Sequence, residues 1–286
     1  MKHAVDHLVL CVSDLERARD FYARLGFTLT PQAQHPWGTA NHLAQLQGSF
    51  LEILTVADRA KISPPGDGEF SFGDFNARFL DRREGFSMLV FRSEDARADQ
   101  RAFAARGLDT YAPFDFSRQA ILPDGSAVTV SFSLAFVTHP AMPEAAFFTC
   151  QQHAPQYFWK PEYQRHANGA TAVAEVMIAA DDPSEFAGFF ERLVDPSAVT
   201  TDGACLRIAL SGAVITVLDP GRLQAWCPEA EMPSGPTFVG YAVAVPDLDR
   251  VEELLRRAAL PYRRRSAGLQ ILPEDAFGTA IEFRPT

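Results

Sequence analysis

Two side chains near the start of the chain could bind a metal ion or exchange a proton. His7 opens one short apolar run, and Glu52 is a lone carboxylate inside a second. On a half-buried strand such a carboxylate needs solvent, a cation or a proton as its partner. An imidazole and a carboxylate are also good ligands for Zn²⁺, Fe²⁺, Ni²⁺ or Mn²⁺. We therefore treat His7 and Glu52 as two candidate functional residues.

Residues that could contact a substrate lie elsewhere along the chain. His42 is a candidate for proton transfer or substrate contact, and the alternative is a strand histidine that forms only a structural hydrogen bond. Trp37, Asn41 and Phe148 are candidate substrate-binding residues, although aromatic side chains more often pack in a core than line a pocket. The histidines near proline-rich loops are expected at the surface, and they are His139, His153 and His166.

The composition disfavours several classes of protein. The net charge of −10 over 286 residues argues against partners such as nucleic acid or an anionic membrane surface. No stretch approaches the roughly 18 apolar residues that span a membrane, and we expect a cytoplasmic protein. The four cysteines are scattered without a CxxC spacing, which favours buried free thiols. The only basic cluster, residues 263–265, is expected to be solvated surface.

A helix and four strands are expected to position His7 and Glu52. Residues 6–12 predict a buried strand, and the periodic apolar residues of 15–25 predict an amphipathic helix that ends at Gly26. Further strands are expected in three segments, at residues 27–30, 42–46 and 50–56. The result is a βαβββ unit with His7 at the head of its first strand and Glu52 in its last.

This pattern occurs four times along the chain. It begins again near residues 86, 174 and 238, and a shift of 168 residues superimposes Asp14 on Asp182 and Phe21 on Phe189. Because one such unit cannot bury a sheet face alone, we predict an α+β protein whose four units pair into two domains. The expected boundaries are 1–153 for the first domain, 154–170 for a linker and 171–286 for the second domain.

The residues of this pattern resemble those of the vicinal oxygen chelate superfamily, which includes glyoxalase I, extradiol dioxygenases and the bleomycin-resistance proteins. The resemblance rests on Asp6-His7-Leu8-Val9-Leu10, on Phe21-Tyr22 with Leu25-Gly26-Phe27, on Phe50-Leu51-Glu52-Ile53-Leu54, and on residues 278–283. Residues 35–41, 147–151, 159–162 and 166–169 are further similar to the glyoxalase-like domain proteins. The resemblance implies two glyoxalase/bleomycin-resistance/dioxygenase-like domains whose sheets close into cups.

The resemblance also implies which residues would bind a metal ion, at the head of the first strand and the middle of the last strand of each unit. In the N-terminal domain these places hold His7, Glu52, Ser87 and Gln151. A register shift of one residue would exchange Gln151 for Gln152 or His153. Since serine is a poor ligand, His7, Glu52 and Gln151 would leave open positions for water and substrate oxygens. The C-terminal domain, expected to be degenerate and metal-free, holds Glu175, Thr216, Gly240 and Glu282.

Two functions follow from this resemblance. The first is a metal-dependent lyase or isomerase of the glyoxalase I type, or an oxygenase, acting on a small substrate with vicinal oxygens. Its cofactor would be a divalent Zn, Fe, Ni or Mn ion. Extradiol cleavage is disfavoured because that site needs two histidines, and only His7 occupies an equivalent place. The alternative is a metal-free protein that binds or sequesters a small molecule in the same cup. A homodimer is common among the relatives.

Overall fold

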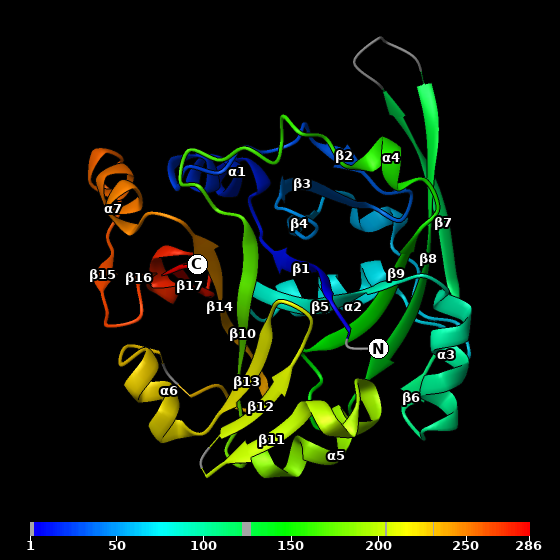
Figure 1. The fold of residues 1–286 in the computed structure, drawn as a ribbon. Coiled ribbons are helices and arrows are strands. Elements are labelled where there is room, and N and C mark those ends of the chain that lie inside the picture. The colour runs from blue at the N-terminus through cyan, green and yellow to red at the C-terminus, as the bar shows by residue number, and fades with distance from the viewer. Residues whose placement is uncertain (1–2, 122–126, 204, 231) are drawn as a thin grey trace.

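The computed structural model describes residues 3–121, 127–203, 205–230 and 232–286, and most of them belong to two curled sheets (Figure 1). The first sheet has the strand order β2-β3-β4-β1-β5-β9-β8-β6, and β7 pairs with β8 at its far end. Its strands are β1 (Val5–Cys11), β2 (Ala33–Gln34), β3 (Thr39–Gln45), β4 (Phe50–Val56), β5 (Gly85–Ser93), β6 (Asp109–Thr110), β7 (Phe114–Ile121), β8 (Ala127–Thr138) and β9 (Ala146–Gln152).

The second sheet has the order β11-β12-β13-β10-β14-β17-β16-β15, which repeats the connectivity of the first. Its strands are β10 (Ala172–Ala179), β11 (Val199–Asp202), β12 (Cys205–Ala209), β13 (Val214–Leu218), β14 (Thr237–Val245), β15 (Arg263–Arg264), β16 (Leu269–Ile271) and β17 (Ala280–Pro285). In each sheet the first and last strands of a unit are parallel neighbours, as β1 and β4 are. The predicted α+β fold of paired βαβββ units is confirmed.

Seven α-helices lie in the described residues: α1 (Leu15–Arg24), α2 (Phe72–Leu80), α3 (Ala96–Ala105), α4 (Pro155–Phe158), α5 (Ala187–Leu193), α6 (Pro220–Trp226) and α7 (Leu248–Arg257). Four short 3₁₀ turns accompany them: η1 (Arg59–Lys61), η2 (Pro183–Phe186), η3 (Pro196–Ala198) and η4 (Pro273–Asp275). The N-cap predicted at Ser13 or Asp14 is Asp14, whose carboxylate accepts a hydrogen bond from Arg17 N at 2.9 Å. Asp95 and Asp247 cap α3 and α7 in the same way.

The largest core lies between the two sheets and contains residues of both. Phe86 of β5 stacks on Phe238 of β14 with their ring centroids 4.1 Å apart. Tyr22 of α1 reaches Tyr241 of β14, and their hydroxyl oxygens lie 3.1 Å apart. The opposite face of each sheet has its own separate core. One face of the first sheet is therefore used to join the two halves, and the other is free to build a cup.

Three features of the fold differ from the sequence-based expectations. The strand expected at residues 27–30 is wrong, because Thr28 N donates to His166 Nδ1 instead of pairing in a sheet. Helix α2 was not predicted, although Ser71 caps it and its phenylalanines pack against the cup side of the first sheet. Strand β7 was also not predicted. Both additions contribute side chains to the cup.

The segment expected as a linker, residues 154–170, packs along β3. The Gln45 side chain donates to Phe158 O at 2.9 Å and accepts from Lys160 N at 3.0 Å. His166 lies 2.8 Å from Gln45 O through its Nε2 atom and is only 8% exposed, so the expectation that it is a surface histidine is wrong. Burial lowers the pKa of His166. The segment therefore forms a wall of the first half of the molecule.

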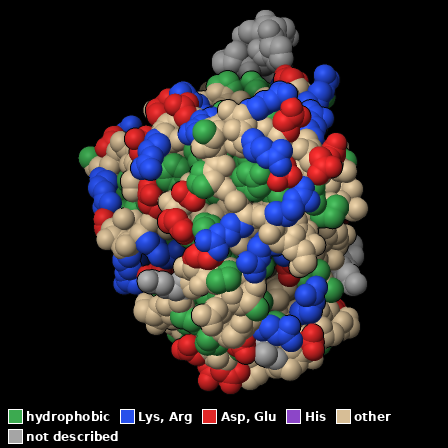
Figure 2. Space-filling model, turned by 90° about the vertical axis from the view of Figure 1, so that its left-hand side faces the viewer, with side chains coloured by type: hydrophobic (Ala, Val, Ile, Leu, Met, Phe, Trp, Pro, Cys, Tyr) green, Lys and Arg blue, Asp and Glu red, His purple; other side chains and the backbone are tan. Residues whose placement is uncertain are grey.

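The surface carries mixed charge. On the face shown in Figure 2, basic and acidic side chains alternate without a large patch of one sign. The predicted basic cluster is neutralised: Arg263 pairs with Glu229, and Arg264 pairs with Asp249 and Glu252. None of the helices in the described part of the chain has the length and hydrophobicity needed to cross a membrane. All four cysteines are buried free thiols, as predicted.

Candidate functional site

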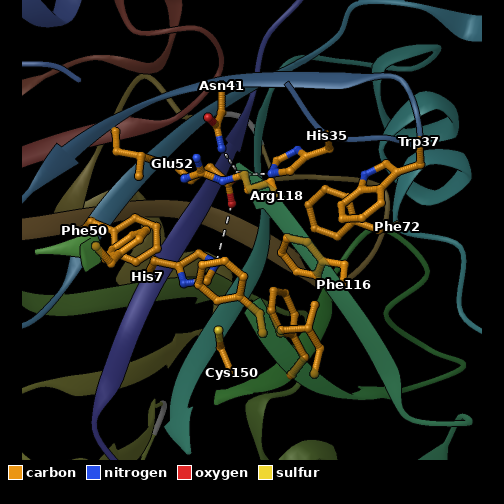
Figure 3. Close-up of a pocket in the computed structure, with 15 residues that line it drawn as sticks. His7, His35, Trp37, Asn41, Phe50, Glu52, Phe72, Phe116, Arg118 and Cys150 are labelled. Carbon is orange, nitrogen blue, oxygen red and sulfur yellow. Dashed lines mark hydrogen bonds and ion pairs between the residues drawn. The ribbon is translucent and has the colours of Figure 1, made fainter. Parts of the chain in front are cut away.

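The parallel register of β1 and β4 brings His7 and Glu52 together. His7 lies opposite Phe50, and Glu52 follows two residues later on the same face of β4. His7 Nε2 lies 3.5 Å from Glu52 Oε2, and both side chains are buried (Figure 3). The imidazole stacks on the Phe50 ring at a centroid distance of 4.3 Å. Two residues that are 45 positions apart in sequence thus face each other at the wall of one cup.

Hydrogen bonds orient both members of this pair. His7 Nδ1 donates to Asp6 Oδ1 at 2.7 Å, and Gln152 Nε2 donates to the other Asp6 oxygen at 3.1 Å. Asn41 Nδ2 donates to Glu52 Oε1 at 2.6 Å. Because the Asp6 carboxylate fixes the proton on Nδ1, the Nε2 atom of a neutral His7 presents its lone pair to Glu52. The arrangement holds one acceptor on His7 and one carboxyl oxygen of Glu52 toward the cup.

A second imidazole, that of His35, approaches the other side of Glu52. His35 Nε2 lies 4.0 Å from Glu52 Oε1, and His35 Nδ1 lies 2.8 Å from Thr39 Oγ1. The ring stacks on Trp37 at a centroid distance of 4.8 Å. Burial lowers the pKa of His35, and the nearby Glu52 carboxyl group opposes this shift without cancelling it. The lowered pKa favours the neutral form of His35.

These residues line a cavity, which we call the inner cavity, with about 500 Å³ of empty space when the part open to solvent is counted. Its polar wall is formed by His7, His35, Asn41, Glu52, Arg118 and Cys150. Its apolar walls are formed by Trp37, Leu43, Phe50, Phe72, Phe116, Phe132, Leu134, Phe148 and Phe158. Burial raises the pKa of the Cys150 thiol, with a further contribution from the Asp6 carboxylate, and this favours the protonated thiol. The structure thus brings Trp37, Asn41 and Phe148 together with His7 and Glu52.

His42 lies outside the inner cavity. Its neighbours Asn41 and Leu43 line the cavity, and strand alternation turns His42 to the opposite face of β3. There its Nδ1 atom lies 2.8 Å from Thr30 O, and its Nε2 atom lies 3.8 Å from Glu16 of α1. The structure thus gives His42 the alternative role, that of a hydrogen-bonded strand histidine.

Gln151 also points away from the cup. Its Oε1 atom accepts a hydrogen bond from Ala96 N at 3.2 Å, and its Nε2 atom donates to Glu94 O at 2.7 Å, which ties the side chain to the start of α3. Its neighbour Gln152 is the residue that reaches Asp6. The structure thus adopts the register that is shifted by one residue and that turns Gln152 toward Asp6. Gln151 is not placed to be a ligand.

The donor set does not fit a metal ion. Among the described residues, no three His, Cys, Asp or Glu side chains are arranged to hold one. The two units can be compared through their parallel strand pairs. In the first unit His7 lies opposite Phe50, and Glu52 is two residues beyond Phe50. In the second unit Met88 lies opposite Ala146, and the residue two positions beyond Ala146 is Phe148, which therefore takes the place of Glu52. Ser87 instead donates to Asn76 Oδ1 of α2 at 2.9 Å. The second unit therefore contributes apolar side chains where the fold would need ligands.

Sequence reasoning missed several residues of the site, among them His35, and it missed Phe116 and Arg118 because it did not assign β7. Phe114, Phe116 and Arg118 alternate along this strand, and a period of two is the signal that could have located it. Phe116 packs edge-on against Trp37 at a centroid distance of 4.9 Å. Arg118 forms no ion pair or side-chain hydrogen bond with the described residues. Burial lowers the pKa of Arg118, and the Glu52 carboxyl group opposes that shift.

The equivalent place in the second sheet is filled by protein side chains. Arg284 of β17 binds both Glu175 and Glu282, the latter at 2.7 Å. Thr216 donates to Glu175, and Trp226 Nε1 of α6 donates to Glu282 at 2.8 Å. A Cβ atom at Gly240 would lie 2.5 Å from the Trp226 ring, so only glycine lets this ring enter. An arginine thus supplies the positive charge here, and a tryptophan fills the space.

Four βαβββ units that pair into two cups, with a His and a Glu from parallel neighbouring strands at one of them, define the vicinal oxygen chelate class. The sequence model of the family described as a glyoxalase-like domain matches residues 5–194, and the chain belongs to this family. No curated protein sequence matches the chain.

Solved structures with little sequence identity share the fold. A hypothetical protein from Staphylococcus aureus is 12% identical with a TM-score of 0.70, over 99% of both chains. The halotolerant catechol dioxygenase BphC is 11% identical with a TM-score of 0.58, over 100% of this chain and 87% of that one. A triple mutant of 4-hydroxymandelate synthase from Streptomyces coelicolor is 15% identical with a TM-score of 0.58, over 99% and 92% of the two chains. At these identities the similarity shows the fold alone.

Proposed function

We propose that the chain binds a small, mainly apolar molecule with adjacent oxygen atoms in the inner cavity and moves a proton on it. Isomerisation and lyase reactions beside a carbonyl group begin with such a proton transfer. The observation that carries the proposal is the position of the Glu52 carboxyl group. It lies buried at the wall of an aromatic cavity, between His7 Nε2 and Asn41 Nδ2.

The apolar and polar walls of the inner cavity make different contributions to ligand binding. The aromatic wall removes apolar surface of a ligand from water, which supplies most of the affinity of a small pocket. The polar wall offers a few directed groups that orient the ligand. Asn41 is one of them, because its Oδ1 atom is buried without a hydrogen-bond partner among the described residues. A ligand hydroxyl group that donates to Asn41 Oδ1 would lie beside Glu52.

The polar wall also supplies the groups that would accept and return the proton. Glu52 takes a proton from the carbon or oxygen atom held beside it, and Asn41 keeps the carboxyl group from rotating. His7 accepts or returns the proton through Nε2, since Asp6 holds the other ring nitrogen as a donor. A carboxyl group and an imidazole 3.5 Å apart can exchange a proton with little movement. The same residues could also hold a ligand without any reaction. Catalytic turnover therefore distinguishes the enzyme from the binding protein.

Replacing Glu52 by glutamine is expected to abolish proton transfer and to preserve binding. A suitable probe is 2-hydroxyacetophenone, an aromatic molecule with vicinal oxygens, whose methylene protons exchange with solvent when they are removed. We expect the wild-type protein to accelerate their exchange in D₂O, followed by proton NMR, and Glu52→Gln to reduce this acceleration by about 100-fold or more. The matched control is Glu191→Gln on the surface of α5. Exchange at the wild-type rate in Glu52→Gln would contradict the proposal. Binding without any catalysed exchange would favour the binding protein.

The metal content of the protein gives a separate test of the metal-dependent form of the hypothesis. Because no three ligand side chains of the described residues are arranged around one point, we expect protein purified without chelators to hold Zn, Fe, Ni or Mn at well below one ion per chain. We also expect His7→Ala to leave that content unchanged. Elemental analysis of the two proteins measures both. One tightly held ion per wild-type chain, lost in His7→Ala, would restore the metal-dependent enzyme.

A further inference from the structure

A second hollow, which we call the outer chamber, adjoins the inner cavity. It has about 1150 Å³ of empty space when the part open to solvent is counted, and it is lined by residues 30–34, by side chains of β3, β7 and β8, and by the segment 157–163. Four residues line both hollows: Asn41, Leu43, Arg118 and Phe158. The two hollows therefore adjoin at these four side chains, which places Arg118 beside both of them.

The charge of the outer chamber is opposite to that of the molecule. Its charged lining residues are Arg118 and Lys160, and no Asp or Glu is among its described lining residues. The whole chain, in contrast, has a net charge of −10. Neither cation forms an ion pair with a described residue, whereas many surface arginines of this protein do, such as Arg59 with Asp81. A half-buried guanidinium without a partner is costly, and natural sites keep one where an anion will bind.

We propose, on the basis of the function proposed above, that the substrate carries an anionic group of the carboxylate, sulfonate or phosphate type that binds Arg118. Lys160 adds a second positive charge on the solvent side. The apolar part of the same molecule lies in the inner cavity, beside Glu52. The planar guanidinium of Arg118 offers paired donors to two oxygens of one anionic group, which a lysine cannot do. Arg118 is thereby the residue that selects anionic over neutral substrates.

The spacing along β7 sets the size of this substrate. Phe116 lines the inner cavity, and Arg118 lies two residues further along the same face at its border with the outer chamber. Residues two apart on a strand are separated by about 7 Å. That separation matches a phenyl ring joined to a carboxylate by a chain of two carbon atoms. The inference therefore names an aromatic acid of this length as the class of ligand.

A matched pair of probes tests the inference, namely 3-phenylpropionate and the neutral 3-phenylpropan-1-ol. Titration of the 286-residue chain, followed by NMR, gives both dissociation constants. We expect the carboxylate to bind about tenfold more tightly than the alcohol, and this preference to weaken as NaCl is added. Arg118→Gln should remove the preference and leave the affinity for the alcohol unchanged. Arg250→Gln, on the exposed face of α7, is the matched control and should change neither affinity.

The possible outcomes separate this inference from the proposed function. Equal affinities for the two probes in the wild-type protein, or a preference that survives in Arg118→Gln, would overturn the role of Arg118. The inner cavity would then still bind the alcohol, and the proposed function would stand. Binding of neither probe at millimolar concentration would contradict both the inference and the proposed pocket. Loss of affinity for both probes in Arg118→Gln would show that the arginine shapes the cavity instead of selecting charge.

Discussion

Replacing Arg284 by methionine is expected to lower the free energy of unfolding by about 3 kcal/mol or more. The guanidinium of Arg284 lies between the carboxylates of Glu175 and Glu282, and Glu282 is only 1% exposed. Removing it leaves two buried negative charges side by side without their cation, which costs far more than an exposed ion pair contributes. The expected loss of unfolding free energy is at the lower end of the usual range because Arg207 remains 3.9 Å from Glu175.

Denaturant unfolding of the purified variants measures this effect. Adding Glu282→Gln to Arg284→Met should recover part of the lost stability, because one of the unpaired charges is then removed. Arg250→Met on the surface of α7 is the matched control, and it should change the free energy of unfolding by less than about 0.5 kcal/mol. A stability of Arg284→Met equal to that of the control would show that the second cup does not depend on its internal cation.

Replacing Phe238 by alanine is expected to cost about 3–5 kcal/mol and to destabilise both halves of the molecule together. Phe238 is fully buried, stacks on Phe86 of the first sheet and lies 5.5 Å from the ring of Phe147. The cavity left by its ring would open into the core that the two sheets share. Since that core supports both sheets, neither half should unfold alone.

The three tryptophans make this test possible. Trp37 and Trp159 lie against the core of the first cup, and Trp226 lies against that of the second. In variants that keep only one of them, the fluorescence transitions of the two halves should coincide, and Phe238→Ala should shift both by the same amount. Tyr157→Ala, at an exposed aromatic residue, is the control. Two separate transitions, of which only that of Trp226 moves, would instead show two independently stable domains.

The two cups share one strand order but carry different side chains at corresponding places. In the first, His7 and Glu52 face an aromatic cavity, and the second unit contributes Phe148 where a ligand would stand. In the second, Arg284 and Trp226 occupy the corresponding place. The chain thus keeps one open site and uses the other half as a packed support for it.

Much of this could be read from the sequence, because it depends on local patterns. The strand–cap–helix–glycine pattern of residues 6–26 and its three repeats are dictated by burial and capping, which act between near neighbours. They predict the βαβββ units and their pairing. The facing of Glu52 also follows from alternation on a strand, since the residues on either side of it are apolar. The pairing of His7 with Glu52 came only with the family resemblance.

Tertiary structure decided the remaining features, for reasons that no local pattern contains. Whether Gln151 or Gln152 faces the cup depends on the register of β9 against β5, and a single step reverses the facing. Arg118 lines the same cavity as Glu52 only because β7 pairs with β8. Arg284 lies between Glu175 and Glu282 only because β17 pairs with β14 and β14 pairs with β10. Local sequence thus determined the units and the facing of Glu52 on its strand. Long-range pairing determined which side chains meet, and therefore the chemistry that the cup can support.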